Sequence, residues 1–224
     1  MILVLANALP PAPVAAELAR RLPEVAPTLA GWLAAAPAET REIAVAEFAC
    51  TPLEAWQLEQ AGYRPPPEVP LGAGWAVLAI EPAMAPASSQ PVWLADMVHL
   101  HVAQQGVTLT DPGALQLAPP ESAALLEAAR PLLQDAGIDA RALGGARLHL
   151  TLPPDLAPYA PTPAAAIGNE IQTWWPQQPA ARAWRRVLNE VQMVWHEHPV
   201  NHARLESGRL PVNGLWLFGG GRAA

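Results

Sequence analysis

The sequence predicts a mixed α/β fold, a single layered domain in which a mixed sheet of about six strands is covered by helices. Three observations predict it. Residues 97–103 and 147–152 alternate between apolar and other side chains, as strands with one buried face do. Residues 182–198 place apolar side chains at the three- and four-residue spacing of an amphipathic helix. The chain has 224 residues, 51% of them apolar, which is enough for a full core. We therefore expect residues 1–224 to form one domain.

The first part of the chain predicts one strand and several helices. The continuous apolar run at residues 2–6 is typical of a buried strand, and we expect it to be the first strand of the sheet. Residues 18–33 suggest helical segments that prolines interrupt. A further helix is expected after Thr51, because proline fills its first turn and Glu54 stands at the capping-box position.

The middle of the chain mixes strand, loop and helix signals. The apolar run at residues 75–80 predicts a strand. Residues 81–92 hold three prolines and two serines, which are typical of an exposed loop. Residues 97–103 and 107–110 predict two short strands, and residues 120–133 predict a helix.

The last part of the chain contains the clearest helix, at residues 182–198. Pro199 ends that helix and begins a short one, which stops at Gly208. Residues 213–218 are apolar on both sides, so they predict a central strand in which Trp216 is buried.

Composition and charge limit the classes of function. The net charge of −7 argues against a nucleic-acid-binding surface. Cys50 is the only cysteine, so neither an internal disulfide nor a cysteine-based zinc cluster is expected. No apolar run approaches the roughly 20 residues of a membrane span, and the start lacks the positive region of a secretory signal. We therefore expect a cytoplasmic protein without a membrane or nucleic-acid partner.

Three histidines and an arginine stand out on the two alternating strands. His99 and His101 share one side of the first strand, and Arg147 and His149 share one side of the second. If the strands are neighbours, the four side chains meet on one polar face. That face is interpreted as a metal site, as an anion pocket, or as a solvated surface. The anion pocket is the hypothesis kept here; no metal and no cofactor are expected.

The C-terminal end combines residues that fix the backbone with residues that donate hydrogen bonds. The set comprises His198-Pro199-Val200-Asn201, Arg204, Gly208, Pro211, Asn213 and the run LWLFGGG at residues 215–221. It resembles the stretch HPVN-x2-R-x3-G-x2-P-(A/V)-N-x-(I/L)-W-L-W-G-x-G of archaeal-type, cofactor-independent phosphoglycerate mutases. The same ending is similar to that of RpfE-type regulatory proteins of bacteria. Residues 96–133 resemble an early segment of the same mutase domain.

The resemblance implies a particular part of the mutase. In those enzymes the stretch lies in a domain inserted into an alkaline-phosphatase-like core. Such a core opens with a strand followed at once by a metal-binding Asp-Gly, whereas residues 2–6 are followed here by Asn7-Ala8-Leu9-Pro10. No serine or threonine among metal ligands is found to act as nucleophile, and the sequence ends three residues after Gly221. We therefore expect the inserted, substrate-side domain without the metal-binding catalytic core, and assign no catalytic residue.

Three residues of the C-terminal pattern have both a functional and a structural interpretation. Arg204, with Asn201 and Asn213, could bind an anion, since a guanidinium pairs with carboxylate or phosphate through two parallel hydrogen bonds. In the structural interpretation Asn213 makes a turn, Asn201 binds loop carbonyls, and Arg204 pairs with Glu206 or Glu197. The glycines at 219–221 are read either as a nest of anion-binding amides or as a flexible tail.

The function expected from the sequence is a non-catalytic ligand-binding or regulatory domain related to phosphoglycerate mutase. Two alternatives remain: an enzyme acting on a small phosphorylated or carboxylated metabolite, and a protein-interaction module. The expected partners are a small anionic metabolite or another protein. The expected ligand-binding residues are Asn201, Arg204, Asn213, His99, His101, Arg147 and His149.

Overall fold

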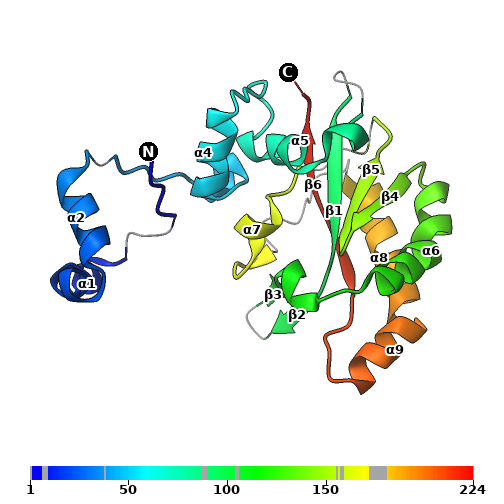
Figure 1. Ribbon diagram of the computed structural model, residues 1–224. Helices are drawn as coiled ribbons and strands as arrows, with labels where there is room; N and C mark the ends of the chain where they lie inside the picture. The colour runs from blue at the N-terminus through cyan, green and yellow to red at the C-terminus, as the bar shows by residue number, and fades with distance from the viewer. Residues whose placement is uncertain are drawn as a thin grey trace. The chain divides into compact units, whose positions relative to one another are not determined.

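The structure is a computed structural model that describes residues 2–6, 10–37, 39–86, 90–103, 106–154, 156, 159–171 and 181–223. Its contacts divide the chain into two compact units, Met1–Ala44 and Val45–Ala224. The first unit holds helices α1 (Ala12–Val25) and α2 (Pro27–Ala35), which contact each other (Figure 1). Each begins with a proline in its first turn, where the missing amide hydrogen is not needed.

The predicted first strand is wrong. Residues 2–6 have no regular secondary structure and are exposed. A short apolar run becomes a buried strand only when other strands pair with it, and the described part of the first unit consists of helices and connecting segments. The remaining unit, Val45–Ala224, contains the sheet and the candidate site.

The second unit confirms the mixed α/β class. Its helices are α3 (Val45–Phe48), α4 (Pro52–Gln60), η1 (Leu71–Gly74), α5 (Trp75–Ala79), η2 (Pro82–Met84), η3 (Pro112–Leu115), α6 (Pro119–Asp135), α7 (Pro163–Ala166), α8 (Arg182–His196) and α9 (Pro199–Glu206). Its strands are β1 (Val92–Val98), β2 (Leu100–Ala103), β3 (Gly106–Leu109), β4 (Asp139–Gly144), β5 (Arg147–Thr151) and β6 (Gly214–Gly221). Within the described ranges these six strands form two antiparallel sheets, a four-stranded one in the order β4-β5-β1-β6 and the hairpin β2-β3.

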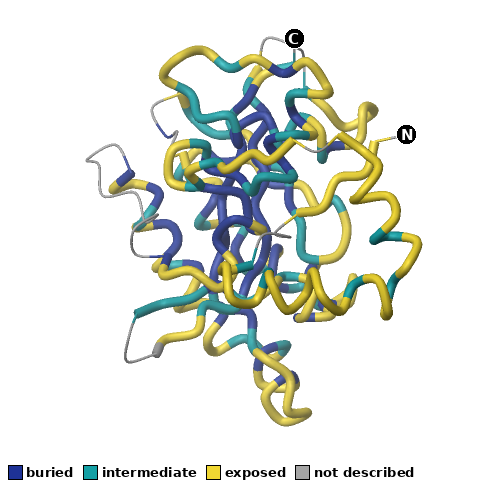
Figure 2. The backbone as a smooth tube through the Cα atoms, turned by 90° about the vertical axis from the view of Figure 1, so that its left-hand side faces the viewer, coloured by how far each residue is buried: buried dark blue, intermediate teal, exposed yellow. Residues whose placement is uncertain are grey.

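The four-stranded sheet has two different faces. On the helix face, alternate residues such as Trp93, Leu150 and Leu217 join a core with α6 and α8. On the opposite face, called the cavity face below, the alternate residues include Asp96 and Arg147. Figure 2 shows that the buried segments gather together in the interior. The strand β1 is buried along its whole length. The alternation predicted for β5 is confirmed, because Leu148 and Leu150 are buried while Arg147 and His149 are half-buried on the other face.

Two strand predictions need correction. The predicted strand at residues 75–80 is instead the helix α5 (Trp75–Ala79), since a short apolar run has no period that separates a buried helix from a strand. β6 lies at the edge of its sheet rather than in its centre, and within the described ranges it pairs with β1. Trp216 is nevertheless buried, as predicted, because α5 and η1 contact β6 and the indole Nε1 donates to the carbonyl of Pro161 (2.9 Å).

The capping box predicted at Thr51 is present and extends into the core. The Glu54 carboxylate accepts hydrogen bonds from the Thr51 amide (2.8 Å) and hydroxyl (2.9 Å) and from the Thr162 hydroxyl (2.7 Å). Glu54 thereby joins α4 to the segment that begins α7. The predicted loop at residues 81–92 contains η2, and residues 87–89 of it lie outside the described part. No helix in the described ranges is both long and apolar enough to cross a membrane.

Candidate functional site

Asn201 fastens the end of α8 to the segment before β6. Its Nδ2 donates to the carbonyls of Trp195 and Val212, each at 2.7 Å, and its Oδ1 accepts from the amide of Val212 (2.8 Å). The residue is 1% exposed. His198 caps α9, because its Nδ1 accepts from the amide of Val200 (3.2 Å). The Asn201 amide therefore makes three hydrogen bonds to the protein's own backbone.

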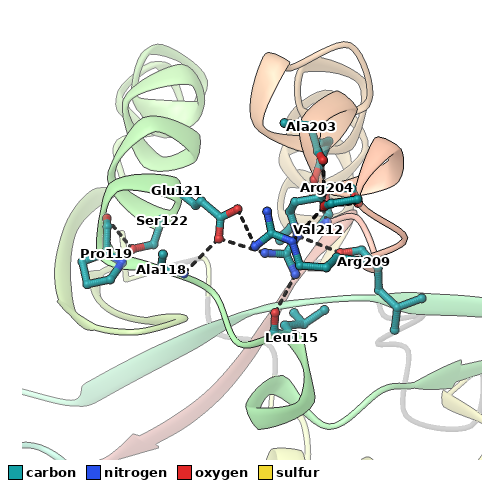
Figure 3. Close-up of polar contacts among 12 residues, drawn as sticks. Leu115, Ala118, Pro119, Glu121, Ser122, Ala203, Arg204, Arg209 and Val212 are labelled. Carbon is teal, nitrogen blue, oxygen red and sulfur yellow. Dashed lines mark hydrogen bonds and ion pairs between the residues drawn. The ribbon is translucent and has the colours of Figure 1, made fainter.

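Arg204 joins three parts of the unit. Its fully buried guanidinium donates from Nε to the carbonyl of Leu210 (2.8 Å), from Nη2 to the carbonyl of Leu115 (2.6 Å), and from Nη1 to Glu121 (2.9 Å) (Figure 3). Leu115 belongs to η3 and Glu121 to the first turn of α6. The structural interpretation expected Glu206 or Glu197 as the partner of Arg204; the partner in the structure is Glu121.

Glu121 is held as a carboxylate at this junction. Burial acts to raise its pKa, but the Ala118 amide and the charges of Arg204 and Arg209 outweigh burial, so the pKa of Glu121 is lowered. The Ala118 amide donates to Oε2 (2.9 Å), and Arg209 Nη1 lies 3.1 Å from Oε1. Glu121 therefore serves both the N-terminus of α6 and the arginines of the C-terminal segment.

Asn213 and His99 connect the C-terminal segment with the end of β1. Asn213 Oδ1 accepts from the amide of Leu100 (2.6 Å), and Nδ2 donates to the carbonyl of the same residue (3.0 Å). His99 Nδ1 donates to the carbonyl of Pro211 (2.8 Å). These contacts of Asn213 and His99 are all with backbone groups of the protein itself.

The four predicted side chains of the polar face do not share one sheet face. His99 lies between β1 and β2, and His101 lies on β2, which pairs with β3. Arg147 and His149 lie on β5, which pairs with β1 and β4. Arg147 and His149 lie on the cavity face, and burial lowers the pKa of His149. His99 and His101 lie together beyond β1, with ring centroids 6.4 Å apart. The premise of one common face is wrong, since the hairpin β2-β3 separates from the larger sheet; ligand binding by these residues stays a prediction.

The glycines at the end of the chain belong to β6. A Cβ atom on Gly219 would lie 2.5 Å from the Ala76 side chain, and one on Gly220 would lie 2.5 Å from the Trp93 ring. Both glycines have positive φ, 102° and 91°. Close packing thus requires them, and the reading of residues 219–221 as a flexible tail is wrong.

The most distinctive charged group on the cavity face is the pair of Asp96 with Arg147. Arg147 Nε and Nη2 donate to the two carboxylate oxygens of Asp96 at 2.7 and 2.8 Å. The Asp96 side chain is 4% exposed and that of Arg147 is 36% exposed. The guanidinium carbon lies 5.3 Å from the centre of the Phe218 ring, an arrangement that favours the cation. The hydrogen bond with Asp96 raises the pKa of Arg147, so its charge is permanent.

A cavity of about 480 Å³ opens beside this pair. Its walls come from α5 and η2, from η3, and from the turn between β4 and β5. The lining residues are Ala79, Glu81, Met84, Asp96, Pro112, Gly113, Gln116, Leu117, Leu143, Gly144, Gly145, Ala146 and Arg147. Its volume falls in the range of small-molecule sites. Of the predicted ligand-binding residues, Arg147 alone is among those lining it.

The C-terminal pattern contributes to this cavity indirectly. Arg204 holds the carbonyl of Leu115, and Leu115 precedes the wall residues Gln116 and Leu117. Gln116 has a φ of 46°, a left-handed backbone conformation that residues other than glycine rarely adopt. Sequence reasoning missed Asp96, Glu81 and Gln116; the one available signal was the single aspartate within a run that is otherwise apolar at residues 92–98.

Within the part of the chain that the structure describes, no group of three or more His, Cys, Asp or Glu side chains is arranged to hold a metal ion.

Comparison with known proteins shows a partial likeness to one class of enzyme. No family model matches the chain. A segment of 56 residues, 25% of this chain, is 36% identical to a probable 2,3-bisphosphoglycerate-independent phosphoglycerate mutase of Geobacter sulfurreducens. That segment spans 14% of the relative's length. The resemblance to cofactor-independent phosphoglycerate mutases is therefore found over part of the chain.

A solved structure gives a likeness of the same kind. The cofactor-independent phosphoglycerate mutase of Thermoplasma acidophilum DSM 1728 is similar over 60% of this chain and 38% of its own, with a TM-score of 0.43 and 20% sequence identity.

Proposed function

We propose that this chain is a non-catalytic ligand-binding or regulatory domain related to the cofactor-independent phosphoglycerate mutases, of the kind found in RpfE-type regulatory proteins of bacteria. One observation carries the proposal. Asn201, Arg204 and Asn213, the side chains that the resemblance singles out, direct their polar groups to the protein's own backbone and to Glu121. The likeness to the mutases thus lies in a scaffold, and a scaffold serves many functions.

The ligand proposed for this domain is a small metabolite with an anionic group. Arg147 supports this proposal, because Asp96 and Phe218 fix its guanidinium at the wall of the cavity. Its Nη1 has no hydrogen bond to another described residue and is a donor for a carboxylate or phosphate. A cavity that combines a fixed cation with apolar walls is the usual form of a small-molecule site.

Two other functions remain as proposals. An enzyme acting on a small phosphorylated or carboxylated metabolite is favoured by the buried Asp96 beside the cavity, since charged groups in clefts are frequent in active sites. A protein-interaction module is favoured by apolar side chains on α8 and α9, of which Met193 is 72% exposed and Leu205 is 56% exposed.

The non-catalytic proposal is tested by a coupled phosphoglycerate mutase assay on the purified full chain. Manganese, cobalt and zinc are added in turn, and an active cofactor-independent mutase is assayed beside it as the positive control. We expect no turnover above background. A rate above about 1 per second, which is ordinary for an enzyme, would overturn the proposal.

A further inference from the structure

Charges of both signs line the cavity, and they differ in how they are paired. Asp96 and Arg147 neutralise each other through two hydrogen bonds. Glu81, at the start of η2, is exposed and makes no ion pair or side-chain hydrogen bond with another residue of the described ranges. The lining therefore carries two carboxylates and one guanidinium, and the unpaired charge is negative.

This charge pattern restricts the ligand. A purely anionic ligand at Arg147 would add a second negative charge to a cavity that already has an excess of one. A ligand that also carries a cationic group would place that group toward Glu81, since opposite charges attract and like charges repel. The cavity thus favours a ligand that carries both signs.

The remaining walls are largely apolar. They are formed by Ala79, Met84, Pro112, Leu117, Leu143 and Ala146. Such a wall takes an apolar group, because burial removes apolar surface from water. The Gln116 carboxamide and the backbone of the Gly144–Gly145 turn add neutral hydrogen-bonding groups.

We infer that the cavity binds a small zwitterion with an apolar body, of the class of free apolar α-amino acids. The ligand carboxylate accepts a hydrogen bond from Arg147 Nη1, its ammonium group faces Glu81, and its apolar side chain lies against Met84 and Leu117. The inference rests on the proposal that the domain binds a small metabolite, and it names the chemical class of that metabolite.

The test compares one zwitterion with two analogues that each lack one of its charges and with a purely anionic metabolite. L-leucine, isocaproate (no ammonium group), isoamylamine (no carboxylate) and phosphoglycerate are added separately to the full chain, and melting temperature and calorimetric affinity are measured. L-leucine is expected to raise the melting temperature, because it binds the folded state preferentially. The three other compounds are expected to shift it less.

Matched variants locate the two contacts. Glu81→Gln is expected to weaken L-leucine binding roughly tenfold, because the partner of the ammonium group is lost, and to strengthen isocaproate binding, because the repulsion between the two carboxylates is removed. Glu68 is an exposed glutamate outside the lining residues, and Glu68→Gln serves as the control. It is expected to change neither L-leucine binding nor isocaproate binding. Arg147→Lys is expected to weaken both L-leucine and isocaproate, because lysine lacks the planar fork that Asp96 holds in place. If Arg147→Lys does not fold, the comparison of Glu81→Gln with Glu68→Gln decides alone.

The outcomes separate this inference from the proposed function. If isocaproate or phosphoglycerate stabilises the protein as much as L-leucine, the role of Glu81 is refuted while ligand binding stands. If Glu81→Gln and Glu68→Gln act alike, the ligand does not sit as inferred. If none of the four compounds shifts the melting temperature, the inferred ligand class is wrong, and the non-catalytic proposal is still decided by the mutase assay.

Discussion

Arg204 and Arg147 are the same residue type in two different settings within one unit. The side chain of Arg204 is 0% exposed and donates to two carbonyls and a carboxylate. That of Arg147 is 36% exposed, makes one pair with Asp96, and borders the cavity. The arginine that the resemblance singles out fastens the fold, and the arginine with a free donor beside a cavity lies outside that resemblance. In this chain, therefore, the arginine that carries the resemblance makes structural contacts, and it does not identify the ligand-binding site.

The physical difference lies in what each charge requires. A fully buried guanidinium must find a partner for its donors inside the protein, since an unpaired buried charge costs several kcal/mol. Arg204 meets that requirement with Leu115, Leu210 and Glu121. Arg147 reaches solvent, so water can accept hydrogen bonds from its guanidinium in addition to Asp96. A ligand group can replace that water.

The largest effect should come from Arg204→Ala. The change removes the donor shared by the carbonyls of Leu115 and Leu210 and by the Glu121 carboxylate, and we expect the free energy of unfolding to fall by about 3–5 kcal/mol. Urea denaturation measures it. Arg209→Ala is the matched control, because Arg209 contacts the same glutamate but is 44% exposed, and it should cost less than about 1 kcal/mol. Equal losses of unfolding free energy in the two variants would show that the buried contacts of Arg204 do not stabilise the fold more than an exposed ion pair does.

A smaller effect is expected at the cavity pair. Asp96→Asn should lower the free energy of unfolding by about 2 kcal/mol, because solvent partly compensates Arg147. The double variant Asp96→Leu with Arg147→Met should lie within about 1 kcal/mol of the natural chain, since an apolar pair of similar volume often replaces a buried ion pair without loss. Urea denaturation of the single variants Asp96→Leu and Arg147→Met and of the double variant gives the coupling energy.

The comparison fails if that double variant is as unstable as Arg204→Ala. The Asp96–Arg147 pair would then be a structural requirement of the sheet, and its position beside the cavity would have no bearing on ligands.

Local features of this fold could be predicted from the sequence. The helix α8, the proline start of α9, the capping box at Thr51 and the alternation of β5 depend on residues close in sequence, and all four are present. The runs at residues 2–6 and 75–80 could not be assigned, because a short apolar segment becomes a strand only when a partner strand lies beside it.

The candidate site could be predicted only in part, since its contacts join distant residues. Arg204 and Glu121 are 83 residues apart, Arg147 and Asp96 are 51 apart, and Asn213 and Leu100 are 113 apart. No local pattern connects such pairs. Arg147 could be predicted as a site residue from the alternation of its strand. Its partner Asp96 follows only from the strand order. The position of Gln116 in the cavity wall follows only from the loop whose Leu115 carbonyl binds Arg204.

A pH dependence of stability should appear at the junction of Arg204 with Glu121. The pKa of Glu121 is lower in the folded protein than its ordinary value of 4.5. The unfolded chain therefore binds more protons as the pH falls, so the stability that Glu121 provides is complete above that ordinary value and is lost as the pH falls through the folded pKa. Glu121→Gln should flatten this acid limb in urea melts recorded across the range. An unchanged acid limb in the variant would assign the dependence to other carboxylates.

The smallest effect on the free energy of unfolding should come from Gln116→Gly. Gln116 follows Leu115, whose carbonyl binds Arg204, and it lines the same cavity as Arg147. Gln116 has a φ of 46°, which a residue with a Cβ adopts at a cost, whereas glycine adopts it freely. Glycine also makes the unfolded chain more flexible, so the two terms oppose each other and we expect a net gain of about 0.5 kcal/mol. Gln116→Ala keeps the strained backbone and should show no gain, which makes it the control for loss of the carboxamide.

If L-leucine stabilises the natural chain but stabilises neither variant, the carboxamide contacts the ligand. If Gln116→Ala binds normally and Gln116→Gly does not, the rigid left-handed turn, which Arg204 fixes through Leu115, is what shapes the cavity wall. A clear loss of stability in Gln116→Gly would mean that the side chain holds the loop, and the strain at this position would have no role.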